Sequence, residues 1–272
     1  MEEVARAKIN LALHVRGREP DGYHRLETVF AFAEDGDRLH ATPGEGLTLS
    51  ITGPFAGGLP TRDDNLVLRA ARGLREACSV DAGAALLLDK RLPVASGIGG
   101  GSADAAAALR LLNRFWNLGA SEETLLEIAR PLGADVPACL LSRTCLGTGR
   151  GDELVAYQAD AFAGAPLLLV NPGVAVSTAD VFRRWSGRDG GPLPANLREA
   201  RNDLQAPAIA SVPVIDGVSA MLSQAPGATL VRMSGSGATC FALFQTEAER
   251  DAADAAVAAR QPTWWRLRSR LG

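Results

Sequence analysis

The sequence predicts an α+β protein, and three stretches of the chain carry that prediction. Residues 5–15 alternate between apolar and other side chains, which is the pattern of a strand with one buried face. A glycine-rich segment at 97–101 is followed by an alanine-rich run of high helix propensity. Residues 228–269 have the order strand, turn, strand, helix, strand. Helices and strands in such an arrangement are typical of the α+β class.

The overall composition is that of an ordinary globular protein. Its 272 residues suffice for one large or two modest domains, and 47% hydrophobic content is ample for a core. The net charge of −3, with mixed signs, does not indicate binding to nucleic acid or to a membrane, so we expect neither as a partner. The N-terminus lacks the features of a signal peptide, and the four cysteines have no metal-site spacing. We therefore expect a cytoplasmic protein with reduced thiols.

The N-terminal half is predicted to contain strands and one early helix. The strand at 5–15 places Lys8, Asn10 and His14 on the same face. A Pro-Asp-Gly turn at 20–22 then leads to Tyr23 and His24. Further strands are predicted at 26–33, 37–41, 47–52 and 84–89, and a helix at 65–78 that Asp63 or Asp64 caps.

The segment from Pro93 to Asp104 has four glycines in five positions and ends in a helix that runs to about 116. Such a loop lets the backbone approach a ligand closely and aims helix N-terminal amides at one point, which suits a phosphate. It lacks the Lys of a Walker A loop and matches a Rossmann fingerprint only in part. A tight turn that merely packs a helix on a strand remains the alternative.

A carboxylate in an unusual setting follows the next helix, which begins at Ser121 and ends near 131–133. Asp135 lies among small and apolar residues just before Pro137. Two interpretations stay open, namely an ordinary helix N-cap and a partly buried carboxylate at an active site.

The C-terminal half begins after a turn at 148–152, between strands at 143–147 and 153–158. We place the domain boundary there, giving domains 1–152 and 153–272. The predicted elements are a strand at 166–170, helices at 177–185 (capped by Ser177), from 202 and at 213–223, strands at 228–233, 239–245 and 263–269, and a helix at 246–260. This order suits a ferredoxin-like sandwich. Residues 232–239 form a second glycine-rich loop, for which a plain hairpin turn is the alternative.

The first glycine segment has the pattern Pro-x-x-x-Gly-x-Gly-Gly-Gly-Ser-x-Asp-Ala, which resembles the ATP loop of the GHMP kinases. This family is named for galactokinase, homoserine kinase, mevalonate kinase and phosphomevalonate kinase. Close relatives often carry more glycine and a second serine, whereas this chain has Ala95, Ser96 and Ala103, so we assign no hydroxyl contact to position 103. The resemblance implies an α+β, two-domain GHMP kinase fold, with an N-terminal ribosomal-protein-S5-domain-2-like domain and a C-terminal ferredoxin-like α/β sandwich.

The resemblance extends over most of the chain. Segments in the family's order lie at 7–11, 21–30, 97–107, 133–137, 202–204 and 232–239. The first two are similar to members of the family that act on a cytidyl substrate. The resemblance therefore implies phosphoryl transfer from ATP to the 2-hydroxyl of 4-diphosphocytidyl-2-C-methyl-D-erythritol, on the non-mevalonate route to isopentenyl diphosphate. It also implies a small-molecule substrate as the partner. We expect a monomer or weak homodimer.

The roles that the resemblance implies are assigned residue by residue. Lys8 and Asp135 match the catalytic pair. The ATP site comprises Pro93, Gly97, Ile98, Gly99, Gly100, Gly101, Ser102, Ala103, Asp104, Ala105, Ala106 and Ala107. The substrate contacts are Asn10, Tyr23, His24, Thr178, Phe182 and Gly237. We expect Mg²⁺ to accompany ATP, with Ser102 as its candidate protein ligand.

Two other functions remain open at this point. One keeps the fold and changes the acceptor, as in a homoserine or mevalonate kinase; the Tyr23-His24 pair argues against it. The other is a nucleotide-binding regulator that has lost catalysis; the presence of both Lys8 and Asp135 argues against that.

Overall fold

The computed structural model describes residues 1–62 and 64–272, which divide into two compact units that interleave along the sequence. The first unit comprises Met1–Ala7, Asp35–Val94 and Gly99–Ser142. The second comprises Lys8–Glu34, Ala95–Ile98 and Arg143–Gly272. The long strands β1 (Glu2–Arg18) and β2 (His24–Thr42) contribute residues to both. A boundary near residue 152 stays a prediction.

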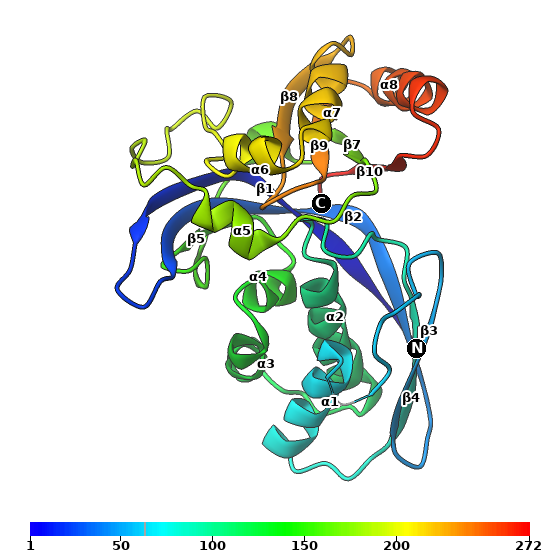
Figure 1. Cartoon of the computed structure of the whole chain (residues 1–272). Coiled ribbons are helices and arrows are strands. Elements are labelled where there is room, and N and C mark those ends of the chain that lie inside the picture. The colour runs from blue at the N-terminus through cyan, green and yellow to red at the C-terminus, as the bar shows by residue number, and fades with distance from the viewer. Residues whose placement is uncertain (63) are drawn as a thin grey trace. The chain divides into compact units, whose positions relative to one another are not determined.

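The first unit combines paired strands with a group of helices (Figure 1). Its elements are β3 (Leu47–Thr52), α1 (Leu66–Ala77), β4 (Ala84–Asp89), α2 (Gly100–Phe115), α3 (Glu122–Ala129), the 3₁₀ turn η1 (Arg130–Leu132) and α4 (Val136–Leu141). β3 runs parallel to β4, and β4 pairs antiparallel with residues 38–42 of β2. Helices α1 and α4 both pack on α2. They can approach it closely because its buried face is lined by Ala103 and Ala105–Ala108.

The second unit holds two sets of strands and the remaining helices. Its elements are β5 (Cys145–Thr148), β6 (Glu153–Ala156), the 3₁₀ turn η2 (Asp160–Phe162), β7 (Pro166–Asn171), α5 (Thr178–Arg183), α6 (Gln205–Ser211), α7 (Val214–Ser223), β8 (Ala228–Met233), β9 (Cys240–Phe244), α8 (Glu247–Arg260) and β10 (Trp265–Arg270). β5 pairs antiparallel with residues 28–30 of β2 and with β6. A separate antiparallel sheet has the order β10-β7-β9-β8.

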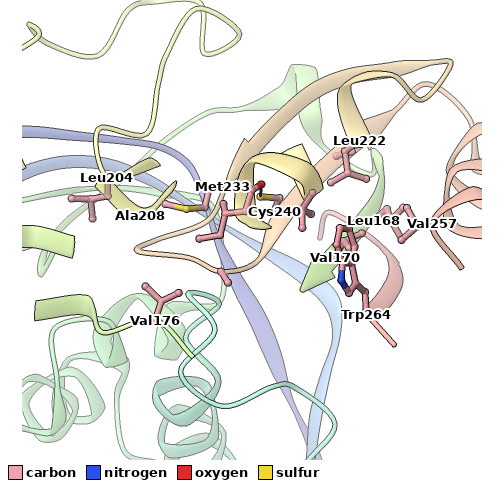
Figure 2. Close-up of a cluster of buried hydrophobic side chains, with 14 of the residues drawn as sticks. Leu168, Val170, Val176, Leu204, Ala208, Leu222, Met233, Cys240, Val257 and Trp264 are labelled. Carbon is pink, nitrogen blue, oxygen red and sulfur yellow. Dashed lines mark hydrogen bonds between the residues drawn. The ribbon is translucent and has the colours of Figure 1, made fainter. Parts of the chain in front are cut away.

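This antiparallel sheet confirms the ferredoxin-like prediction. Its strands follow the chain order β7, β8, β9, β10, and helices α7 and α8 pack on it (Figure 1). Figure 2 shows the core between sheet and helices, where Leu168 and Val170 of β7 lie near Val257 of α8 and Trp264. Burial of such side chains stabilises the fold by about 1.5–3 kcal/mol each.

The structure corrects two local predictions. The predicted strands 26–33 and 37–41 form one continuous strand, β2. Gly36 lies between the two predicted strands, at a close approach of two backbones, since a Cβ there would lie 1.8 Å from the carbonyl oxygen of Ala5. The cap of α1 is neither candidate: Asn65 accepts a hydrogen bond from the Val67 amide at 2.9 Å. Asp64 is not the cap, and Asp63 lies outside the described residues.

The other predicted elements agree within a few residues, including the Ser177 cap of α5. All four cysteines are free thiols. Among the helices of the described residues, none combines the length and the apolar character needed to cross a membrane.

Candidate active site

Lys8, the predicted catalytic lysine, is buried on β1 in the second unit. Its ammonium donates a hydrogen bond to Oδ1 of Asn10 at 2.9 Å and lies 5.4 Å from the centre of the Phe30 ring. The Asn10 amide in turn donates to Oγ1 of Thr28 at 2.8 Å. The period-two alternation of the strand therefore brings Lys8 and Asn10 together, as the sequence predicts, and fixes the direction of the ammonium.

The two glycine-rich loops meet in the second unit. Ser234 donates its hydroxyl to the Gly97 carbonyl at 2.9 Å and accepts the Asn10 amide N–H at 3.2 Å. The Thr239 amide donates to the Ser96 carbonyl at 3.2 Å. The plain hairpin interpretation of 232–239 is therefore incomplete, because this loop also fixes the residues that precede the α2 helix and the strand that carries Lys8.

The contact between these loops leaves no space for side chains at two glycines. Gly97 has φ +78°, and a Cβ there would lie 2.4 Å from the carbonyl oxygen of Ser234. Gly235 has φ +55°, and a Cβ there would lie 2.8 Å from the carbonyl oxygen of Gly97. Glycine at both positions is thus required by the left-handed backbone and by the close approach together.

Two aromatic rings lie beside His24, a predicted substrate contact. The His24 ring lies 4.8 Å from the Phe182 ring and 5.6 Å from the Trp185 ring, centre to centre. Burial lowers the pKa of His24, and the charge of Arg18 lowers it further, so the ring is neutral at pH 7. Within the described chain, its buried Nε2 has no hydrogen-bond partner.

His24 also lines a cavity of about 660 Å³ in the second unit. Most of the residues that line it are charged, and the lining comprises Arg16, Glu19, His24, Arg25, Leu26, Glu27, Thr148, Gly149, Arg150, Asp152 and Glu153. A cavity of this size with a neutral imidazole in its wall can hold a polar aromatic ligand.

Tyr23 is a predicted substrate contact whose side chain is exposed, at 56% exposure. The guanidinium of Arg150 stacks 3.7 Å from the centre of its ring, and Arg150 also pairs with Asp21. Arg150, which the sequence reasoning missed, thus supports the ring from the 148–152 turn. Phe182, another predicted substrate contact, packs on His24 and not on Tyr23.

Thr178 and Gly237, two further predicted substrate contacts, are connected by Ser236 of the second glycine loop. Thr178, at the start of α5, shares a hydrogen bond of 2.8 Å with the hydroxyl of Ser236. Gly237, next to Ser236, is buried and donates its amide to the Ser234 carbonyl at 3.0 Å.

The predicted phosphate site in the first unit is the beginning of α2. Gly99 is its N-cap, with φ +65°, and the first intrahelical bond runs from the Ala103 amide to the Gly99 carbonyl at 2.8 Å. The amides of the first turn, from Gly100 to Ser102, have no partner inside the helix, because helix geometry supplies none. With the helix dipole, they form a suitable site for an anion.

Asp135, the predicted catalytic carboxylate, precedes α4 in the same unit. It is half-buried and has a helical backbone (φ −82°), unlike the extended residue that usually caps a helix with its side chain. At the other end of α4, Arg110 of α2 donates to the carbonyls of Cys139 and Leu140 at 2.7 and 3.1 Å. The helix that begins with the phosphate site therefore also holds the helix that follows Asp135.

Comparison with known proteins places this arrangement in a family. The model of the GHMP kinases N terminal domain matches residues 65–143, and that of the GHMP kinases C terminal matches residues 184–262. The chain is 56% identical over 276 residues to a 4-diphosphocytidyl-2-C-methyl-D-erythritol kinase from Rhizorhabdus wittichii, covering 99% of this chain and 94% of the relative. The chain belongs to this kinase family.

Other comparisons agree with the assignment to this family. A Sphingopyxis alaskensis protein of the same name is 50% identical, covering 100% of this chain and 98% of the relative. A crystal structure of a 4-(cytidine 5'-diphospho)-2C-methyl-D-erythritol kinase superposes with a TM-score of 0.85 at 34% identity, covering 100% and 99% of the two chains. Homoserine kinase from Cytophaga hutchinsonii has a TM-score of 0.75 at 17% identity, covering 100% of this chain and 94% of its own, which shows a shared fold alone.

In this GHMP kinase, the side chain of one predicted ATP-site residue lies inside the protein. Asp104 is buried on α2 and accepts a hydrogen bond from Lys90. Lys90 and its second partner Asp37 were not singled out from the sequence. A lone lysine after a strand and an aspartate within one are common surface features, so no local signal distinguished them.

Proposed function

We propose that the chain transfers the γ-phosphoryl group of ATP to the 2-hydroxyl of 4-diphosphocytidyl-2-C-methyl-D-erythritol, giving the 2-phosphate and ADP. The observation that carries this proposal is the resemblance, at 56% identity over almost the whole chain, to a kinase of that name. The homoserine and mevalonate alternatives have support only from distant structural neighbours, at 17% and 18% identity.

The nucleotide phosphates would bind at the beginning of α2. The first-turn amides and the helix dipole favour an anion there, and Ser102 lies half-buried in the same turn. Among the described residues, no group of three or more His, Cys, Asp or Glu side chains is arranged to hold a metal ion. The proposed Mg²⁺ ion would enter with the phosphates, with Ser102 as its candidate protein ligand.

Lys8 and Asp135 would act on the acceptor hydroxyl. Phosphoryl transfer has a loose transition state with charge spread over the moving group, so a fixed ammonium stabilises it. The ammonium of Lys8 is fixed in this way, because its Nζ donates a hydrogen bond to Oδ1 of Asn10 at 2.9 Å. Asp135 would orient the hydroxyl and accept its proton. The convergence of these two side chains on one hydroxyl is part of the proposal.

The cytidyl group would bind beside His24. Its neutral ring, with a buried Nε2 that lacks a partner in the described chain, can hydrogen-bond the edge of a base. Tyr23, supported by Arg150, offers an exposed aromatic face for stacking. Asn10, Thr178, Phe182 and Gly237 stay predicted contacts of the substrate.

The first test is Asp135→Asn, assayed by coupled ADP release with the cytidyl substrate, with and without magnesium. We expect kcat to fall by about a hundredfold or more, with little change in either KM, because the group is used in the chemical step. Asp81→Asn, which alters a fully exposed carboxylate in the same unit, is the matched control and should keep normal kcat. A near-normal kcat for Asp135→Asn would refute the assigned role, and absence of turnover in the unmodified protein would refute the function.

A further inference from the structure

A cavity of about 540 Å³ in the second unit takes no part in the reaction proposed above. It lies between helix α6 and the chain that follows α5, and these two helices pack on each other. Its lining combines two arginines and a tryptophan after α5 (Arg184, Trp185 and Arg188) with three small residues of α6 (Ala206, Pro207 and Ala210). A cavity of this size can hold a small ligand.

The guanidinium groups of Arg184 and Arg188 distinguish this cavity. Both residues are exposed, and within the described residues neither side chain has an ion pair or a hydrogen bond. The three arginines that line the His24 cavity are, by contrast, each paired with a carboxylate. A turn separates the two residues, in which the hydroxyl of Ser186 accepts the Arg188 amide at 3.3 Å. Two unpaired cations therefore line one wall of the cavity.

The carboxylates beside these arginines are bound to other groups. Asp203, which also lines the cavity, accepts hydrogen bonds from Arg201 at 2.6 Å and from a main-chain amide of β1 at 2.8 Å. Asp189, which follows Arg188 in the chain, pairs with Arg16 at 3.0 Å. The two cavity arginines with the Arg201–Asp203 pair comprise three guanidiniums and one carboxylate, which leaves a net charge of +2. Such an excess of positive charge attracts an anion.

Trp185 gives the same cavity a flat apolar surface. The indole is half-buried, packs against the buried core of the second unit, and lies edge-on to His24 at 5.6 Å between ring centres. These contacts fix its position before any ligand binds. The small residues of α6 leave room for a ring, and aromatic rings pack favourably on an indole.

We propose that this cavity binds an aromatic phosphate monoester, with the phosphate on Arg184 and Arg188 and the ring on Trp185. Guanidinium groups match phosphate oxygens in bidentate hydrogen bonds. A phosphate monoester carries about −1.5 to −2 charges at pH 7, which complements the excess positive charge of the cavity. The inference goes beyond the proposed function, because none of these three residues is assigned to ATP, to the cytidyl substrate or to catalysis.

The test is a titration of the full chain with phenyl phosphate, followed by NMR on the indole N–H signal of Trp185. Loss of one signal in Trp185→Phe identifies it among the four tryptophans of the chain. In the unmodified protein this signal should shift saturably at millimolar phenyl phosphate. The double variant Arg184→Gln with Arg188→Gln should bind about tenfold more weakly or worse, because the charged partners of the phosphate are lost.

Arg183→Gln is the matched control. Arg183 is also exposed and directly precedes Arg184, but it pairs with Asp180 and does not line the cavity, so its variant should keep the affinity of the unmodified protein. Ala210→Phe fills the cavity from an exposed position of α6 without changing any charge, and it should also weaken binding about tenfold or more. This variant keeps the inference testable if the double variant does not fold.

Inorganic phosphate and phenol, the two halves of the probe, should each bind at least about tenfold more weakly than phenyl phosphate, since each makes only part of the contacts. Equal affinity of either half would overturn the inference. Absence of a saturable shift of the Trp185 signal, or equal affinity in the unmodified protein and the double arginine variant, would also overturn it. The titration needs neither ATP nor an acceptor, so these outcomes leave the proposed function intact, whereas absence of turnover would refute that function alone.

Discussion

His14 shows how a buried side chain is fixed in one protonation state. It lies on β1, on the strand face that also carries Lys8 and Asn10, but it contacts a different part of the second unit. Its Nδ1 donates to the Gly191 carbonyl at 3.1 Å, and its Nε2 accepts the Arg201 amide at 3.2 Å. With one nitrogen donating and the other accepting, only the neutral imidazole satisfies both bonds. The ring thus anchors the long loop before α6.

Stability should therefore fall in mild acid in a way that depends on His14. Burial lowers its pKa below the usual 6.5; the Gly191 bond, Asp203 and Glu27 oppose this shift, and Arg201 adds to it. As the pH falls through 6.5, the unfolded chain binds a proton that the folded chain does not, so the free energy of unfolding decreases. Urea unfolding at pH 7.5 and 5.5 should show a smaller decrease for His14→Gln than for the unmodified protein.

His40→Gln serves as the comparison variant for this measurement, because it replaces a histidine whose side chain is 38% exposed. Equal losses of stability in the unmodified protein and in His14→Gln would contradict the assignment.

Site residues that are close in the sequence could be predicted to lie together, whereas partners that are distant in the sequence could not. Lys8 and Asn10 are two positions apart, so strand periodicity alone places them together. Lys90 and Asp37 are 53 residues apart, and Tyr23 and Arg150 meet across an even longer separation. Periodicity and local motifs carry no information on such pairs, because their contacts depend on how strands and turns are arranged in three dimensions.

At the level of elements, the two glycine loops act as one structural part of the second unit. Residues 96–97 and 234–239 are joined by main-chain and hydroxyl hydrogen bonds, and Gly97 lies where the two backbones are closest. Each loop is recognisable in the sequence as a glycine-rich turn. Their mutual contact is not, because the same composition would serve two separate turns.

Gly97→Ala tests this contact, with Gly187→Ala as the matched control. Both glycines have φ +78°, but a Cβ at Gly187 has no atom within 4 Å, whereas at Gly97 it would lie 2.4 Å from the Ser234 carbonyl oxygen. Gly187→Ala should cost about 1–2 kcal/mol from the left-handed backbone alone. Gly97→Ala should cost more than about 3 kcal/mol, since the loops must also separate. Equal losses in urea unfolding would show that the contact is not close in solution.

At the level of the whole molecule, the fold does not determine the acceptor. The ferredoxin-like sheet order follows from the sequence pattern, and homoserine kinase shares the fold at a TM-score of 0.75 with 17% identity. We propose that acceptor choice depends on local groups such as the exposed Tyr23 ring and the neutral His24 beside its cavity. A fold comparison alone would not distinguish a cytidyl substrate from an amino acid or a hydroxy acid.

Turnover of three acceptors, followed by ADP release, tests this division of roles. We expect phosphorylation of 4-diphosphocytidyl-2-C-methyl-D-erythritol and none of homoserine or mevalonate.

Tyr23→Ala should raise KM for the cytidyl substrate by about five- to a hundredfold, because stacking on a base is worth about 1–3 kcal/mol. Tyr157→Ala, which removes the chain's other tyrosine, should leave KM unchanged. An unchanged KM in Tyr23→Ala would exclude stacking there, and turnover of mevalonate alone would show that the local groups select a different acceptor.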